Sequence, residues 1–272
     1  MTVGFHAPNE IANLTAEHGE KKAKLPISSI MLLGFLGGAF ISIGYLLDIR
    51  VTANLPEEWG TFNTLIGASV FPVGLVLIII AGGELLTGNM MAVSMAFLTK
   101  RVSVWKLLNN WLWITIFNFI GALFVAYFFG QLAELTSQGV YLEKVVEIAN
   151  GKLEDSFLAS TVSAIGCNWL VGLAVWLAYG AEDIGGKILA IWFPIMAFVA
   201  IGFQHVVANM FVIPAAIFSG YFSWNAFIGN FIPVFLGNAI GGFVFVSLFY
   251  RLAYKRTMDS DRMKEGLRRR RK

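Results

Sequence analysis

Residues 200–211 read Ala-Ile-Gly-Phe-Gln-His-Val-Val-Ala-Asn-Met-Phe and lie inside a long apolar run, yet they carry the polar side chains Gln204, His205 and Asn209. Polar side chains at membrane depth are costly and mark a candidate functional site. The same pattern stands 120 positions earlier, at Gly82, Glu84, Asn89 and Met90. The chain therefore carries two related polar interruptions in apolar sequence.

Downstream of both interruptions, identical residues continue to recur 120 positions apart, with no insertion or deletion between the matches. Five residues of the first half have identical counterparts in the second half. Asn110, Asn118, Ile120, Gly121 and Phe129 correspond to Asn230, Asn238, Ile240, Gly241 and Phe249. Weak internal symmetry at one fixed offset is typical of channels and secondary transporters built from two repeats.

The composition excludes an ordinary soluble domain. Of the 272 residues, 57% are hydrophobic and only 14% are charged, whereas a soluble domain has about a quarter charged residues. The charges that exist fall in short clusters between apolar runs, which indicates a polytopic membrane protein. Cys167 is the single cysteine and lies in an apolar run, so no disulfide framework or cysteine-based metal site is expected. We expect no metal and no cofactor.

The apolar runs predict six crossings. A membrane-spanning helix needs about 20 residues, and four runs fit one crossing each, at about residues 26–47, 105–130, 157–180 and 226–250. Two further runs, 63–99 and 188–218, are too long and contain residues that disfavour helix interiors. They predict second and fifth helices that are broken by unwound segments at 82–89 and 202–206, surrounded by protein or by a water-filled cavity.

We expect three parts along the chain: an amphipathic N-terminal segment (1–25), one transmembrane domain (26–250) and a basic tail (251–272). Three crossings in each repeat, 26–130 and 157–250, make the repeats inverted, with a long, largely acidic loop at 131–156 between them. Basic residues gather in the N-terminal segment, at Lys100–Lys106 and in the tail, which places both termini in the cytoplasm of a cell membrane. The cluster Arg268–Lys272 favours contact with anionic lipid over nucleic acid.

The two breaks predict an anion site near the middle of the membrane. Each half-helix after a break begins with unpaired N–H donors and partial positive charge. Thr87 adds a hydroxyl to the first break and His205 adds an imidazole to the second. Plainer interpretations stay open. His205 could hydrogen-bond between helices, and Glu84 could accept from free backbone N–H groups of the break. Asn118 and Asn238 could be structural, and Phe71, Leu75 and Phe198 could be core or lipid-facing residues.

The segment Gly202–Phe211 resembles the signature of the formate/nitrite transporter family, and Ala81–Asn89 resembles that family's Ω-loop. The resemblance covers about residues 26–250. It implies an all-α, aquaporin-like six-helix bundle of two inverted three-helix repeats, assembled as a homopentamer with one pore in each protomer. It also implies pore roles for His205, Thr87, Asn168 and Gln204, a vestibule role for Lys152, structural roles for Glu84, Asn89 and Asn209, and a constriction at Phe71, Leu75, Leu85, Leu86 and Phe198.

Two positions depart from the family's pattern. Gln204 stands where glutamate is common, which removes a charge from the neighbourhood of His205 and alters its basicity. Leu86 stands at an Ω-loop position that can be phenylalanine, which predicts a looser cytoplasmic constriction.

The expected function is passage of a small monovalent anion, with formate first, in a pH-dependent or proton-linked way through His205. Nitrite or hydrosulfide transport by the same fold stays open. So does an aquaporin-type neutral solute channel, although paired Asn-Pro-Ala boxes are absent. A scaffold would not explain two polar breaks. An intramembrane enzyme would need a nucleophile–base pair or a metal cluster, so we expect no enzymatic activity.

Overall fold

The structure, a computed structural model, describes residues 4–260, and within this range all regular structure is helical. Six helices of the described part are long and apolar enough to cross a membrane: Ile27–Thr52, Thr61–Gly82, Val104–Leu132, Phe157–Gly180, Ile184–Ile201 and Trp224–Ala253. The predicted all-α architecture with six candidate crossings is therefore confirmed. The basic cluster Arg268–Lys272 lies outside the described residues.

The first half of the chain begins with a peripheral helix, α1 (Pro8–Ala23), and a long helix, α2 (Ile27–Thr52). A short 3-10 turn, η1 (Glu57–Trp59), precedes the second crossing, which consists of α3 (Thr61–Val70), α4 (Val73–Val76) and the π-helical segment η2 (Leu77–Gly82). After a break come the half-helix α5 (Leu86–Leu98) and the long helix α6 (Val104–Phe124), which η3 (Val125–Leu132) continues in π-helical form.

The second half repeats this order. A peripheral helix α7 (Gly139–Leu153) precedes the long helix α8 (Phe157–Gly180). The broken crossing consists of α9 (Ile184–Ile201) and the half-helix α10 (Val206–Phe218). The last crossing runs through α11 (Trp224–Ile240), π-helical η4 (Gly241–Leu248) and α12 (Phe249–Ala253). The half-helices α5 and α10 start at 86 and 206, and α6 and α11 at 104 and 224, so both pairs keep the offset of 120.

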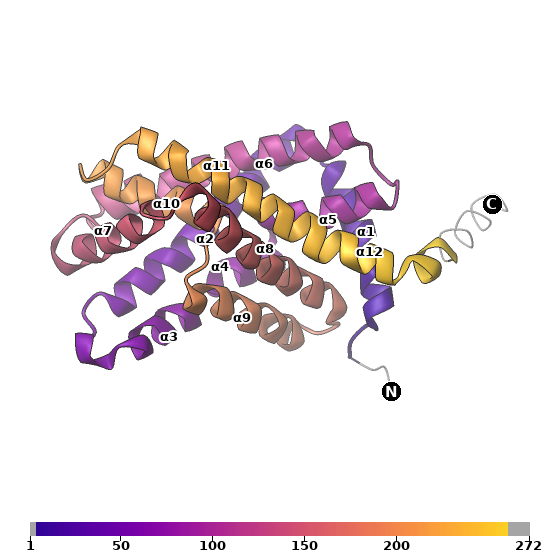
Figure 1. The fold of residues 1–272 in the computed structure, drawn as a ribbon, viewed down its shortest axis with the longest axis horizontal. Helices are drawn as coiled ribbons and strands as arrows, with labels where there is room; N and C mark the ends of the chain where they lie inside the picture. The colour runs from indigo at the N-terminus through magenta and orange to yellow at the C-terminus, as the bar shows by residue number, and fades with distance from the viewer. Residues whose placement is uncertain (1–3, 261–272) are drawn as a thin grey trace.

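The expected loop at 131–156 is mostly helical, which corrects the sequence-based prediction. Helix α7 occupies most of it, with Val145 and Ala149 fully buried. These two residues are four positions apart and therefore lie on one face of the helix. The charged residues between and around them lower the average hydrophobicity of the segment, so the sequence predicts a polar loop. In Figure 1, α7 and α3 lie at one end of the bundle, and α1 and α12 lie at the other.

Both breaks are shorter than predicted. Gly82 and Gly202 have positive φ angles of +106° and +85°, which only glycine adopts readily, and they end the first part of each broken helix. The second parts begin at Leu86 and Val206, so Thr87, Gly88 and Asn89 are helical rather than unwound. Their weak helix propensity is overridden by tertiary contacts of the Thr87 and Asn89 side chains.

Close helix packing brings the outer crossings against the breaks. A Cβ atom added to Gly38 of α2 would overlap the carbonyl oxygen of Asn118 in α6, and one added to Gly237 of α11 would overlap that of Thr161 in α8. Since lipid gives helices no hydrophobic reason to associate, such small residues allow the backbone approach that holds a membrane bundle together.

Candidate functional site

The two breaks meet at one polar contact in the interior of the bundle. Thr87, in the first turn of α5, lies with its Oγ1 3.0 Å from Nε2 of His205, which caps the N-terminus of α10. Both side chains are buried, with exposures of 0% and 2%. The N-terminal ends of the two half-helices therefore converge, and each end carries partial positive charge.

The hydrogen bonds of His205 define its tautomer. Its Nδ1 accepts a hydrogen bond from the backbone N–H of Ala208 at 3.0 Å, so Nδ1 carries no hydrogen in this arrangement. In neutral imidazole the proton is then on Nε2, which donates to the hydroxyl of Thr87. The hydroxyl hydrogen of Thr87 stays available for another acceptor. A second proton on His205 would make Nδ1 a donor and break the cap of α10.

Asn168 of α8 supports the Thr87 side of the contact. Its Nδ2 donates to the carbonyl oxygens of Thr87, at 3.2 Å, and Asn238, at 2.7 Å. Its Oδ1 is buried and has no hydrogen-bond partner among residues 4–260. The side chain thus ties α5 to α8 and α11 and offers an unused acceptor close to the polar contact.

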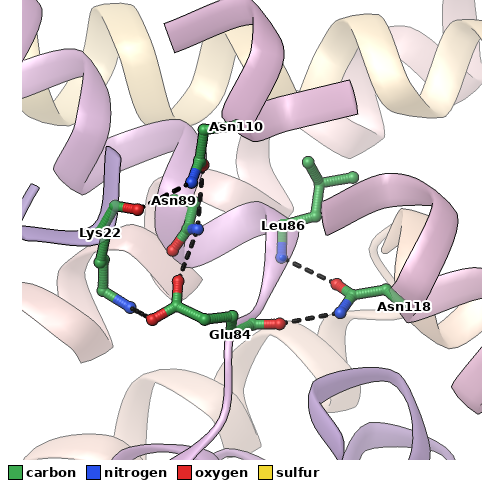
Figure 2. Close-up of polar contacts among 6 residues, drawn as sticks. All are labelled: Lys22, Glu84, Leu86, Asn89, Asn110 and Asn118. Atoms are coloured by element: carbon green, nitrogen blue, oxygen red, sulfur yellow. Dashed lines mark hydrogen bonds and ion pairs between the residues drawn. The ribbon is translucent and has the colours of Figure 1, made fainter. Parts of the chain in front are cut away.

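Two repeat-related asparagines hold the breaks in place. Asn118 accepts from the backbone N–H of Leu86 at 2.9 Å and donates to the carbonyl oxygen of Glu84 at 2.8 Å (Figure 2). Asn238 does the same for the backbone of Val206, at 2.9 Å, and Gln204, at 3.1 Å. One asparagine in each repeat thereby satisfies two backbone groups at the break, as buried polar groups require.

Glu84 is part of a buried ion pair rather than a partner of loose backbone N–H groups, which corrects the plainer of the sequence-based interpretations. Its carboxylate accepts from Nζ of Lys22 at 2.8 Å and from Nδ2 of Asn89 at 2.7 Å (Figure 2). Asn89 also donates to Asn110 at 3.0 Å, and Asn110 donates to the carbonyl oxygen of Lys22 at 3.2 Å. This network connects α1, the first break, α5 and α6.

The second repeat contains a corresponding network in which Gln204 stands in place of Glu84. Gln204 accepts from Nδ2 of Asn209 at 2.8 Å and donates to Asp155 at 2.8 Å and to the carbonyl oxygen of Lys152 at 3.1 Å. Asn230, the counterpart of Asn110, also donates to the carbonyl oxygen of Lys152, at 2.7 Å. Gln204 makes no hydrogen bond to His205 within the described residues, so its effect on the histidine is indirect.

Lys152 differs from Lys22, its counterpart, in what its ammonium contacts. Its Nζ donates to the carbonyl oxygens of Gly202 at 3.0 Å and Phe203 at 3.2 Å, which leaves one N–H unused among the described residues. Burial lowers the pKa of the Lys152 ammonium, and the Asp155 carboxylate opposes this effect. An ammonium without a directly bonded carboxylate is free to attract an anion.

A path leads from the end of the bundle near α7 toward the central contact. An outer vestibule of about 340 Å³ is lined by residues of α2, α3, α7 and α9, among them Asp48, Lys144, Glu147 and Lys152. It shares Tyr45, Lys152 and Val199 with a smaller chamber of about 40 Å³, which is also lined by Phe71, Phe198, His205 and Asn209 among others. A cavity of that size holds a few water molecules.

Aromatic rings and aliphatic side chains close the path beyond the chamber. The rings of Phe71 and Phe198 meet edge to face with centroids 5.7 Å apart, and Phe198 lies 5.6 Å from the His205 ring. The space beyond them, lined by Leu75, Leu85 and others, is too narrow for a water-sized sphere. Leu86 is fully buried but lines none of these three spaces. The structure therefore closes the pore on the side of Phe71 and Phe198 that faces away from the chamber.

Sequence reasoning missed Tyr45, Asp48 and Lys22. The signal for Lys22 was present, because Lys22 and Lys152 each stand five residues before the first residue of a long helix, at 27 and 157. Tyr45 and Asp48 gave no such signal, since both lie in the expected first crossing or at its edge without a repeat partner. Among residues 4–260, no group of three or more His, Cys, Asp or Glu side chains could hold a metal ion.

Comparison with known proteins places the chain among membrane transport proteins. Residues 9–252 match the family described as formate/nitrite transporter. The chain is 62% identical over 264 residues to an uncharacterized transporter of Bacillus subtilis, covering 97% of this chain and 99% of the relative. It is 56% identical over 254 residues to a formate channel of Bacillus thuringiensis, covering 93% and 98%.

A solved structure shares the fold. A pentameric formate channel with formate bound superposes with a TM-score of 0.70 at 29% sequence identity, and the match covers 84% of this chain and 96% of that one. The fold of the bundle is thus that of a known channel architecture.

Proposed function

This chain belongs to the formate/nitrite transporter family, and on that premise we propose that it passes formate through a central site at Thr87 and His205. The single observation that carries the proposal is the 3.0 Å contact between these two side chains, at the point where two half-helix N-termini meet. Hydrogen-bond donors and partial positive charge at one point suit a small anion. The activity is transport and not catalysis.

Lys152 makes the first contact in this mechanism. Its ammonium lies on the wall shared by the vestibule and the chamber and raises the local concentration of small anions. Larger or doubly charged anions are excluded further in, because the Phe71 and Phe198 rings leave no room for a hydrated ion. Stripping water from an anion in such surroundings costs several kcal/mol.

The central site lowers that barrier in two ways. With His205 neutral, the hydroxyl of Thr87 takes a hydrogen bond from Nε2 and directs its own hydrogen to a formate oxygen. When His205 takes a second proton on Nδ1, its bond to Ala208 breaks and an imidazolium faces the anion. Transfer of a proton from the imidazolium to formate leaves a neutral imidazole and gives neutral formic acid, which crosses the dry apolar segment at far smaller cost.

The proposal extends to assembly and orientation. Similarity to the pentameric formate channel supports a homopentamer with one pore in each protomer. The basic residues of α1 and the stretch after α5 lie toward the end where α12 also lies, which supports cytoplasmic termini in a cell membrane and membrane lipid around the bundle (Figure 1). The vestibule near α7 then opens outward.

Uptake of labelled formate by liposomes that contain the purified protein tests the function. We expect formate uptake well above that of protein-free liposomes, with nitrite as a competitor of similar size and charge. Uptake of water or glycerol without formate would instead identify a neutral solute channel. Preference for nitrite over formate would keep the mechanism but change the substrate.

A further inference from the structure

Tyr45 stands at the junction of the outer vestibule and the inner chamber, and it lines both. Its side chain comes from α2 and the residue is only 8% exposed. Within residues 4–260 its hydroxyl takes part in no hydrogen bond, although Asp48 follows it by one helical turn. The hydroxyl oxygen is not fully enclosed by protein, so it is available to a molecule in the spaces that Tyr45 lines.

The ring of Tyr45 is held by aromatic neighbours. It meets Phe71 edge to face with centroids 5.3 Å apart and lies 6.1 Å from the ring of Phe211. Phe71 in turn contacts Phe198, which closes the path to His205. Because the ring has little freedom, the hydroxyl is fixed in place just outside the constriction.

Charge is distributed unequally between the two spaces. The vestibule is lined by the carboxylates of Asp48 and Glu147 as well as by Lys144 and Lys152. The chamber is lined by one charged side chain, Lys152, whose ammonium retains an unused N–H. An anion that moves inward therefore leaves carboxylates behind and meets two unused donors, one on Lys152 and one on Tyr45.

We propose that the chamber is a separate anion-binding site in which the Tyr45 hydroxyl and the Lys152 ammonium hold a carboxylate or oxyanion of formate size before it passes Phe71 and Phe198. The inference rests on the proposed function and adds a residue that selects the substrate. A chamber of about 40 Å³ admits a small anion and excludes a longer chain. A hydrogen bond from Tyr45 to one oxygen orients the carboxylate for passage.

Tyr45→Phe tests the site, because it removes the hydroxyl and keeps the ring that contacts Phe71. No protein hydrogen bond is lost, so the variant should fold. Formate binding to purified protein is measured by saturation-transfer NMR on the formate proton, and formate uptake is measured in liposomes. We expect a roughly ten- to hundredfold higher half-saturating formate concentration in both experiments, which corresponds to the loss of one hydrogen bond to a charged group, with the maximal flux nearly unchanged.

Tyr179→Phe is the matched control. The hydroxyl of Tyr179 likewise has no hydrogen-bond partner in the described chain, but it is buried and lies at the opposite end of α8 from the vestibule. Its removal should leave formate binding from outside unchanged. Equal half-saturating concentrations for wild type and Tyr45→Phe would overturn the inference, and so would a lower maximal flux alone, which would mean that the hydroxyl only shapes the constriction.

The two proposals fail in different ways. If wild-type protein conducts formate and Tyr45→Phe binds it equally well, the inference is wrong and the function stands. If wild-type liposomes do not take up formate while NMR shows binding that depends on Tyr45, the site stands and the transport function is wrong.

Discussion

Replacing Glu84 by glutamine should destabilise the protein through the ammonium that it leaves behind. The carboxylate of Glu84 accepts two hydrogen bonds, from Lys22 at 2.8 Å and Asn89 at 2.7 Å, and the Lys22 and Glu84 side chains are only 17% and 7% exposed. Glutamine keeps one acceptor oxygen, so it can serve one donor and places its own NH₂ group against the other. The Lys22 charge then has no counter-charge in the network.

The magnitude follows from that geometry. Removing one partner of a buried ion pair costs about 3–5 kcal/mol, and residual water access to Lys22 places this case near the lower limit, at about 3 kcal/mol. The double variant Lys22→Met/Glu84→Gln removes the unpaired charge and leaves the glutamine oxygen for Asn89. We expect it to recover to within about 1 kcal/mol of wild type, because paired removal of a buried ion pair is often nearly neutral.

The free energy of unfolding is measured by SDS titration followed by circular dichroism. Glu147→Gln is the control, since it makes the same chemical change in a pair with Lys144 where Glu147 is 69% exposed, and it should change stability by less than about 1 kcal/mol. A Glu84→Gln variant as stable as Glu147→Gln would refute the reasoning. So would a double variant that is less stable than Glu84→Gln alone.

Two further predictions concern the outer end of the pore. Lys152→Ala should reduce formate uptake more at low salt than at high salt, because an attraction between partly exposed charges is screened by salt; equal reduction at both salt concentrations would indicate a structural role. A cysteine placed at position 144, in a Cys167→Ser background, should react with an impermeant thiol reagent from outside the cell. Labelling from the cytoplasm only would contradict the proposed orientation.

The sequence was sufficient for the fold because the two features that define it are coded locally. Apolar run lengths predict the crossings, and the offset of 120 residues pairs Gly82 with Gly202 at the two positive-φ positions that end the helices. The predicted end of the first break was wrong, because the low intrinsic helix propensity of Thr87, Gly88 and Asn89 suggested an unwound segment. Contacts made by Asn89 with Glu84 in the break and with Asn110 of α6 stabilise the helix there.

The site was predictable where it follows the repeat and not where it depends on packing. Thr87 and His205 stand out as polar residues in apolar breaks, and the structure brings them together. The position of Lys22 matches that of Lys152, but its contact with Glu84, 62 residues away, depends on how α1 packs and could not be predicted in the same way. Tyr45 is an ordinary residue of an apolar helix until its hydroxyl is seen to face two cavities without a partner.

The pH dependence of formate uptake by a His205→Asn variant tests the central claim most directly. Asparagine retains a donor of similar reach to Thr87 but does not titrate near neutrality, whereas an unperturbed histidine does so at about 6.5. Flux is measured in liposomes at fixed membrane potential over the range of about pH 5–7, with folding and assembly checked by size-exclusion chromatography. We predict that the variant still passes formate but loses most of the wild-type dependence on pH. A folded His205→Asn variant with an unchanged pH profile would contradict proton handling by His205 and leave the side chain as a helix cap.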